Sequence, residues 1–303
     1  MRELALGTGI LYFPVTPFDA DDRVDGELLG ELVAERLPFE PGGVFAACGT
    51  GEFHALSAAE HEEAVRAAVD ATAGAVPVVA GAGGPLGHAR ANAAAAERAG
   101  ADGLLVMPPY LVGGPQAGLV EYVRDLSRRT ELPLIVYHRG AAQFDGESMR
   151  RLLELPSVVG VKDGAGDVAM MQRFVRIAAA SGRDIRFFNG LLTAEASQAA
   201  YRAIGVPLYS SAAFAMAPEA ADAFHRASRD GDLETQARLL DGFFLPLVSL
   251  RDETPGFAVS LVKAGLRLMG KRVGPVRPPL VDPDADQTAR LAELLDRGRD
   301  LAA

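Results

Sequence analysis

The chain has 303 residues, 49% of them hydrophobic, and a formal net charge of −10, so it can bury a large core and is a poor partner for nucleic acid. Because no apolar run approaches about 18 residues and the first residues lack the apolar centre of a signal peptide, we expect a cytoplasmic protein without a membrane span. The single cysteine, Cys48, leaves no partner for an intrachain disulfide and no cysteine-based zinc site.

Short apolar segments alternate with longer segments of helical spacing along the chain. The predicted strands cover residues 10–13, 44–47, 76–80, 103–107, 134–137, 158–162, 185–189 and 206–210. The predicted helices cover residues 26–37, a segment that opens at 57, and 88–99, 116–129, 146–155, 168–180, 193–204 and 218–229. Ser57 and Glu60 have the spacing of a capping box, and Pro218 suits a first helical turn. Eight such strand–helix units predict a closed (β/α)₈ TIM barrel.

The barrel is predicted over residues 1–230, followed by a helical extension over residues 231–303. Helical spacing recurs in the extension at 232–250, 256–269 and 284–302. Since no long Pro/Gly linker separates the two parts, we expect one structural unit. A doubly wound sheet is the rival fold, but the Gly-rich segment 81–87 misses the G-x-G-x-x-G spacing of a dinucleotide site.

Lys162 ends the apolar segment 158–161, which is typical of a strand buried on both faces. Burial of a lysine lowers its pKa, and the neutral amine can attack a carbonyl group, whereas arginine keeps its proton. The chain has 30 basic residues, but only Lys162, Lys263 and Lys271 are lysines. We therefore predict Lys162 as a Schiff-base nucleophile.

Polar groups gather where the predicted strands end, the edge that carries the chemistry in barrel enzymes. An amine, phenols, hydroxyls and an arginine at one edge suit attack on a ketone, proton transfer by a phenol, and binding of a carboxylate. Tyr137 is the candidate phenol beside Lys162. The candidate substrate contacts are Gly49, Gly51, Arg139, Asn189, Ser210 and Ser211.

These motifs resemble the dihydrodipicolinate synthase/N-acetylneuraminate lyase superfamily, and the resemblance runs nearly end to end. It rests on Phe13-Pro-Val-Thr-Pro-Phe18, Gly49-Thr-Gly-Glu52, Tyr137 and Gly160-Val-Lys-Asp163. The resemblance implies a covalent imine on Lys162, proton transfer by Tyr137 with Thr50 and water, and a homo-tetramer. It implies no metal or organic cofactor, because the lysine imine serves as the electron sink.

Three departures from the synthase itself argue against its activity. Gly49 occupies the place of the first of two adjacent threonines, and Tyr110 is followed by Leu111 where a second tyrosine is expected. Ala142 stands where the synthase has its carboxylate-binding arginine, while Arg139 lies two residues after Tyr137.

Within the superfamily, the chain resembles the branch that dehydrates and decarboxylates 5-dehydro-4-deoxy-D-glucarate to 2,5-dioxopentanoate, CO₂ and water. The segments that carry this match are 136–139, 209–212, 243–246 and 256–265. The implied partner is a small keto-deoxy sugar diacid. Two alternatives stay open: an aldolase of the same superfamily acting on a 2-keto-3-deoxy sugar acid, and a non-catalytic barrel that binds sugar acids.

Histidines and the cysteine receive weaker assignments. We expect His61, Glu62 and Glu63 to form a solvated helix face, and Cys48 to be a small buried hydrophobic residue. His54 and His138 lie near the predicted site, where either a structural or a catalytic role suits them.

Overall fold

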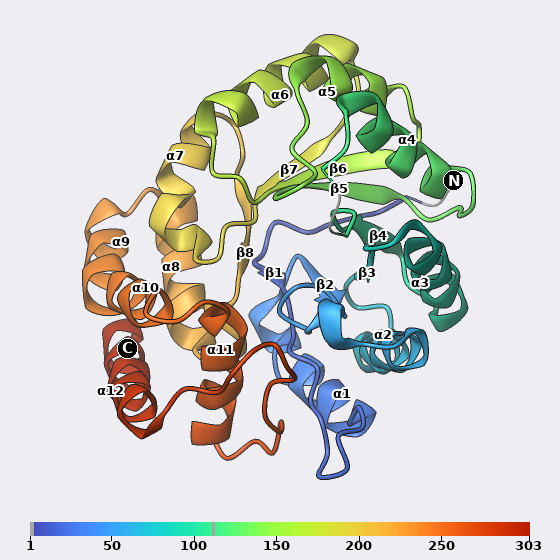
Figure 1. The fold of residues 1–303 in the computed structure, drawn as a ribbon. Coiled ribbons are helices and arrows are strands. Elements are labelled where there is room, and N and C mark those ends of the chain that lie inside the picture. The colour runs from blue at the N-terminus through green and yellow to red at the C-terminus, as the bar shows by residue number, and fades with distance from the viewer. Residues whose placement is uncertain (1–2, 111–112) are drawn as a thin grey trace.

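Eight parallel strands close into a barrel surrounded by helices (Figure 1). The computed structural model describes residues 3–110 and 113–303. Neighbouring strands pair in chain order, and β8 pairs with β1. The strands are β1 (Leu11–Tyr12), β2 (Gly43–Ala46), β3 (Val78–Ala82), β4 (Gly103–Val106), β5 (Leu134–His138), β6 (Val158–Asp163), β7 (Arg186–Asn189) and β8 (Leu208–Ser211). The predicted (β/α)₈ barrel is confirmed.

The barrel helices follow the strands in alternation. They are α1 (Gly26–Ala34), α2 (Ala58–Thr72), α3 (Leu86–Ala99), α4 (Gln116–Ser127), α5 (Gly146–Leu153), α6 (Val168–Ser181), α7 (Gln198–Ala203) and α8 (Pro218–Asp230). Short 3-10 turns lie at η1 (Leu37–Phe39), η2 (Phe53–Ala55), η3 (Ala194–Ser197) and η4 (Ala213–Ala215). The capping box of Ser57 and Glu60 and the first-turn position of Pro218 are both confirmed.

Two strands, β3 and β8, begin two residues later than the sequence predicts. β3 starts at Val78 rather than at residue 76. Pro77 has no N–H to donate to a neighbouring strand, and it contributes only its carbonyl, which accepts from the Val44 N–H at 2.9 Å.

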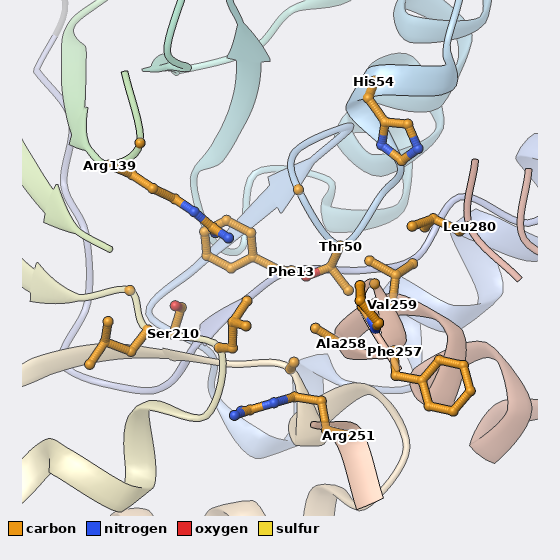
Figure 2. A pocket seen from close by; sticks show the side chains of 18 of the residues that line it. Phe13, Thr50, His54, Arg139, Ser210, Arg251, Phe257, Ala258, Val259 and Leu280 are labelled. Carbon is orange, nitrogen blue, oxygen red and sulfur yellow. The ribbon is translucent and has the colours of Figure 1, made fainter. Parts of the chain in front are cut away.

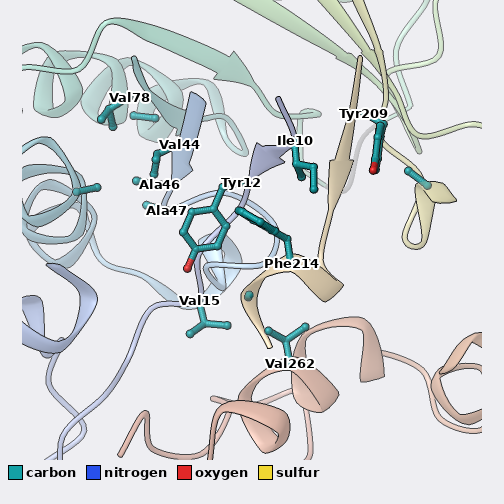
Figure 3. Packing of buried hydrophobic residues seen from close by; sticks show 14 of the residues in the cluster. Ile10, Tyr12, Val15, Val44, Ala46, Ala47, Val78, Tyr209, Phe214 and Val262 are labelled. Atoms are coloured by element: carbon teal, nitrogen blue, oxygen red, sulfur yellow. The ribbon is translucent and has the colours of Figure 1, made fainter. Parts of the chain in front are cut away.

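The core has two parts because successive side chains of each strand point to opposite faces. A small inner cluster fills the barrel, with Leu11, Phe45, Val79, Leu105 and Ile135 among its members. A larger outer cluster packs the strands against the helices (Figure 3). Cys48 belongs to the inner cluster and is fully buried, as expected.

The extension gathers on one side of the barrel, next to α8 (Figure 1). It contains α9 (Leu233–Leu239), the π-helical segment η5 (Leu240–Phe244), α10 (Leu245–Arg251), α11 (Phe257–Leu268) and α12 (Ala285–Ala302). α9 and α12 contact α8, and α11 contacts η4 beyond β8. The predicted C-terminal helices are therefore present. Among the helices of the described residues, none is long and apolar enough to cross a bilayer.

The expected solvated face of α2 is wrong at His61. This side chain is fully buried, and its Nε2 lies 2.6 Å from the Gly81 carbonyl oxygen of β3. Burial lowers the pKa of the imidazole. His61 therefore ties α2 to the barrel, while Glu63 is exposed as expected.

Candidate active site

A cavity of about 640 Å³ opens at the carboxyl ends of the strands (Figure 2). Six of the residues predicted from the sequence line it: Gly49, Thr50, Tyr137, Arg139, Lys162 and Ser210. Tyr137, Lys162 and Ser210 are the last inward-facing residues of β5, β6 and β8. The barrel thus brings together side chains that are far apart in the sequence.

Lys162 is 5% exposed and lies among aromatic rings. Its Nζ is 3.7 Å from the ring centroid of Phe13 and 4.6 Å from that of Tyr137. Burial lowers the pKa of the amine from 10.5 to about 7, the Cys48 thiol opposes this shift, and the Arg139 guanidinium adds to it. A large fraction of the amine is therefore neutral near pH 7.

Aromatic rings attract an ammonium ion, which works against the lowered pKa. That attraction is worth about 2 kcal/mol when the cation is desolvated. A shift from 10.5 to about 7 corresponds to roughly 5 kcal/mol in favour of the neutral form. The loss of hydration therefore outweighs the aromatic contacts.

Gly190, directly after β7, makes room for this lysine. A Cβ at this position would lie 2.2 Å from the Lys162 Cε and 2.5 Å from its Cγ, closer than carbon atoms can approach. The Gly190 carbonyl also accepts a hydrogen bond from the Tyr137 hydroxyl at 3.2 Å. Gly190 therefore shapes the positions of both reactive side chains.

Tyr137 is paired with Arg139 two residues later. The Arg139 Nη1 donates to the Tyr137 hydroxyl oxygen at 2.9 Å. Burial raises the pKa of the phenol, while the positive charge of Arg139 and its hydrogen bond act to lower it. The guanidinium thus makes a transient phenolate easier to form, which suits a proton-transfer group.

Asp163 fixes the end of β6 just beyond the lysine. One carboxylate oxygen accepts from the Ala165 N–H at 2.9 Å, and the other is hydrogen-bonded to the Tyr201 hydroxyl of α7. Its side chain is buried on the outer face of the barrel, opposite Lys162. The turn after β6 is therefore held from outside while the lysine points inward.

Three predicted substrate contacts lie outside the cavity lining. The Asn189 amide donates to Ala194, Ser197 and Gln198, and the Ser211 hydroxyl accepts from the Phe214 N–H. The Gly51 carbonyl accepts from the Thr16 hydroxyl at 2.7 Å. The polar groups of these residues thus bond within the protein instead of lining the cavity.

The alternation of side-chain directions along a strand predicts that two of these three residues, Asn189 and Ser211, point away from the barrel interior. Phe188 and Leu208 point into the barrel, so Asn189 points outward, and Ser210 points inward while Ser211 points outward. Gly51 lies in a loop, where no such alternation applies.

Of the other residues singled out from the sequence, some line the cavity and some lie outside it. Tyr110 is 63% exposed, and Leu111 lies outside the described residues. His54 lines the cavity. His138 faces outward, where its Nδ1 accepts from the Phe144 N–H at 3.0 Å, which gives it a structural role.

Several lining residues were not anticipated as site residues. Phe13 was recognised only as part of a motif, and it provides the ring under Lys162. Arg251 at the end of α10 and Phe257, Ala258 and Val259 at the start of α11 form the wall contributed by the extension (Figure 2). No local sequence pattern places the extension over the barrel, so this wall could not be predicted.

The cavity is locally cationic in a protein of net charge −10. Arg139, Lys162 and Arg251 line it. Among the described lining residues, Asp252 is the single carboxylate, and it is paired with Arg251 at 2.8 Å. An anionic ligand therefore finds local positive charge despite the overall field.

The chain is similar to known proteins over nearly its whole length. The model of the "Dihydrodipicolinate synthetase family" matches residues 7–297. A protein from Streptomyces coelicolor named "Probable 5-dehydro-4-deoxyglucarate dehydratase 1" is 50% identical over 298 residues, covering 98% of this chain and 94% of its own. One of the same activity name from Paracidovorax citrulli is 42% identical, covering 96% of each chain.

Solved structures share the fold. A dihydrodipicolinate synthase from Oceanobacillus iheyensis superposes with a TM-score of 0.89 at 24% identity, covering 98% of this chain and 97% of its own. The synthase from Bacillus clausii gives a TM-score of 0.86 at 26% identity, covering 97% and 98%.

Proposed function

Because the chain belongs to the dihydrodipicolinate synthetase family, we propose that it is a lysine-dependent dehydratase. Its substrate is 5-dehydro-4-deoxy-D-glucarate and its products are 2,5-dioxopentanoate, CO₂ and water, the reaction that fits the names of its relatives. The observation that carries the proposal is the buried amine of Lys162, with a pKa lowered to about 7, facing a cationic cavity beside Tyr137.

The reaction begins with imine formation. The Lys162 amine adds to the ketone carbon, and the ketone oxygen leaves as water. The imine acidifies the adjacent methylene group, whose proton is taken by Tyr137 with Thr50 and water. The electron pair moves toward nitrogen and gives an enamine.

The enamine then expels the β-hydroxyl, which leaves as water after protonation, and a conjugated iminium forms. The bond to the far carboxylate breaks, CO₂ departs, and its electron pair flows through the double bonds to nitrogen. Protonation on carbon, tautomerisation of the remaining enol to the aldehyde and hydrolysis of the imine release the product and the free lysine. The water lost in imine formation is returned in hydrolysis, so the net change is loss of one water and one CO₂ with uptake of one proton.

The carboxylate next to the ketone must lie within a few ångströms of Lys162. Arg139 is close enough to Lys162 to affect its pKa, and its guanidinium has further N–H groups besides the one bonded to Tyr137. Gly49, Thr50 and Ser210 line the same part of the strand ends. We assign this carboxylate to Arg139, with support from these three residues.

Product analysis tests the proposal. Purified protein incubated with 5-dehydro-4-deoxyglucarate should release one CO₂ for each 2,5-dioxopentanoate formed, and the Lys162→Ala variant should release none. Pyruvate together with an aldehyde, in place of CO₂, would show aldol cleavage and contradict the dehydratase assignment.

The proposal extends to assembly and location. We propose a cytoplasmic homo-tetramer in which the barrel, 1–230, and the extension, 231–303, act as one unit. Exposed apolar side chains on the extension support self-association: Leu233, Leu245, Leu268, Met269 and Val281 are 43–72% exposed. Sedimentation equilibrium showing a monomer at working concentration would contradict this part.

A further inference from the structure

Arg251 is a second guanidinium in the cavity, and it comes from the extension rather than from the barrel. It is the last residue of α10, whereas Arg139 directly follows β5. Figure 2 shows the two side chains approaching the cavity from separate sides, Arg139 from above and Arg251 from below in that view. Both line the cavity that contains Lys162.

The position of Arg251 is fixed before any ligand binds. Its Nη1 donates to the Thr193 hydroxyl at 2.6 Å, and its Nε donates to the Asp252 carboxylate at 2.8 Å. Its side chain is only 15% exposed. These bonds leave Nη2 without a hydrogen-bond partner among the described residues, so the guanidinium keeps donors for an anion.

The surroundings of Arg251 favour an anion. The first residues of α11, Phe257 to Val259, line the same cavity. The Phe257 and Val259 N–H groups donate to the Thr254 and Gly256 carbonyls, which leaves the Ala258 N–H without a hydrogen-bond partner among the described residues. The partial positive charge of this helix end adds to that of the guanidinium. The nearby carboxylate of Asp252 is already paired, and its side chain is 58% exposed, which weakens its opposition.

We propose that Arg251 is the specificity-determining residue that binds the far carboxylate of the substrate. The inference rests on the proposed function, in which a dicarboxylate forms an imine with Lys162. Arg139, next to Tyr137, takes the carboxylate beside the ketone, and Arg251 takes the one at the other end. The barrel supplies the reaction chemistry, and the extension supplies the choice of a diacid over a mono-acid.

Imine formation with two matched keto acids tests this role without requiring dehydration. 2-Oxoadipate carries a far carboxylate, and 2-oxohexanoate has the same carbon chain without it. Borohydride trapping gives the concentration of each acid that half-saturates the lysine. The wild-type protein should prefer 2-oxoadipate by about 10–100-fold, the range expected for one charged hydrogen-bonded contact.

Arg251→Gln should reduce that preference to within about threefold, since the charged contact to the far carboxylate is removed. Arg226→Gln on α8 is the matched control, because Arg226 is also paired with an aspartate but lies outside the cavity lining. It should behave like the wild type. A wild-type preference that persists in Arg251→Gln, or no preference in the wild type, overturns the inference.

Thr193→Val provides a milder test if Arg251→Gln fails to fold. It removes the hydroxyl that orients the guanidinium but keeps the charge. The preference for 2-oxoadipate should fall, and an unchanged preference overturns the inference. A failure of the dehydratase proposal would be seen separately, as imine trapping without CO₂ release.

Discussion

Two lysines are deeply buried in this protein, at sites that differ in their neighbours. The Lys263 Nζ of α11 lies 2.6 Å from the Glu52 carboxylate, with both side chains 0% exposed, and it donates to the Pro275 carbonyl. Lys162 lies over aromatic rings in the cavity, and no described carboxylate lies within ion-pair distance of it.

Burial lowers the pKa of both lysines, but at Lys263 the Glu52 carboxylate acts in the opposite direction. The amine of Lys263 is bonded to two protein oxygens and lies outside the cavity lining. Burial alone therefore does not make a nucleophile; a lysine must also lack a carboxylate and face a cavity. The Lys263–Glu52 pair instead connects α11 to the loop that carries Thr50.

The largest expected effect comes from removing the unpaired amine. Lys162→Arg should be as inactive as Lys162→Ala, with turnover below detection, because a guanidinium keeps charge but cannot attack a ketone. Lys271→Arg is the matched control: Lys271 is partly exposed and paired with Glu35, so its variant should stay active. Steady-state assays of the three variants check this. Residual turnover in Lys162→Arg would refute the assignment of Lys162 as the nucleophile.

Tyr137→Phe removes the phenol beside that amine and keeps the ring. We expect turnover to fall by about 10²–10⁴-fold, the usual contribution of a positioned proton-transfer group, while the fold and slow imine trapping remain. Single-turnover kinetics measure the loss. A decrease of tenfold or less would reduce Tyr137 to a packing residue.

Matched Lys→Met changes should shift stability in opposite directions. Lys263→Met leaves the buried Glu52 carboxylate without its charged partner and should destabilise the fold by about 3–5 kcal/mol. Lys162→Met removes an amine whose burial opposes folding and should stabilise it. Denaturant unfolding measures the change in unfolding free energy of each variant. Changes of the same sign would contradict the opposite effects expected for the two lysines.

The gain from Lys162→Met should depend on pH. The folded-state pKa, about 7, is below the usual 10.5, so between these values the unfolded chain binds more protons than the folded one. Wild-type stability therefore rises with pH across this window. The advantage of the variant should be greatest below pH 7 and should disappear toward pH 10.5.

Catalysis should follow the same titration. Since the neutral amine is required, kcat/KM should rise about tenfold per pH unit up to about pH 7 and then level off. In Arg139→Gln the rising limb should move to higher pH, because the guanidinium lowers the pKa of Lys162. The pH profile of kcat/KM is measured for the wild type and for Arg139→Gln. A rising limb at the same pH in both would show that Arg139 does not lower the pKa of Lys162.

The parts of the molecule that follow from local patterns could be predicted from the sequence. The eight-fold alternation gave the barrel, and the rule that chemistry lies at strand ends brought Lys162 and Tyr137 together. The side-chain directions of Asn189 and Ser211 were missed, although they follow from counting alternate residues inward from Phe188 and Leu208.

The wall made by the extension could not be predicted in this way. Arg251 and Phe257 reach the cavity only because α10 and α11 pack against the barrel beyond β7 and β8. Likewise, Lys162 and Lys263 look alike as residues that follow apolar segments. The pairing of Lys263 with Glu52, far away in the sequence, distinguishes them.

Borohydride trapping with a keto acid, followed by peptide mass mapping, compares the two lysines most directly. The expected result is a single reduced adduct on the peptide that contains Lys162, lost in Lys162→Ala and retained in Lys271→Arg. An adduct on Lys263 or Lys271, or no adduct at all, would contradict the assignment of Lys162 as the reactive amine.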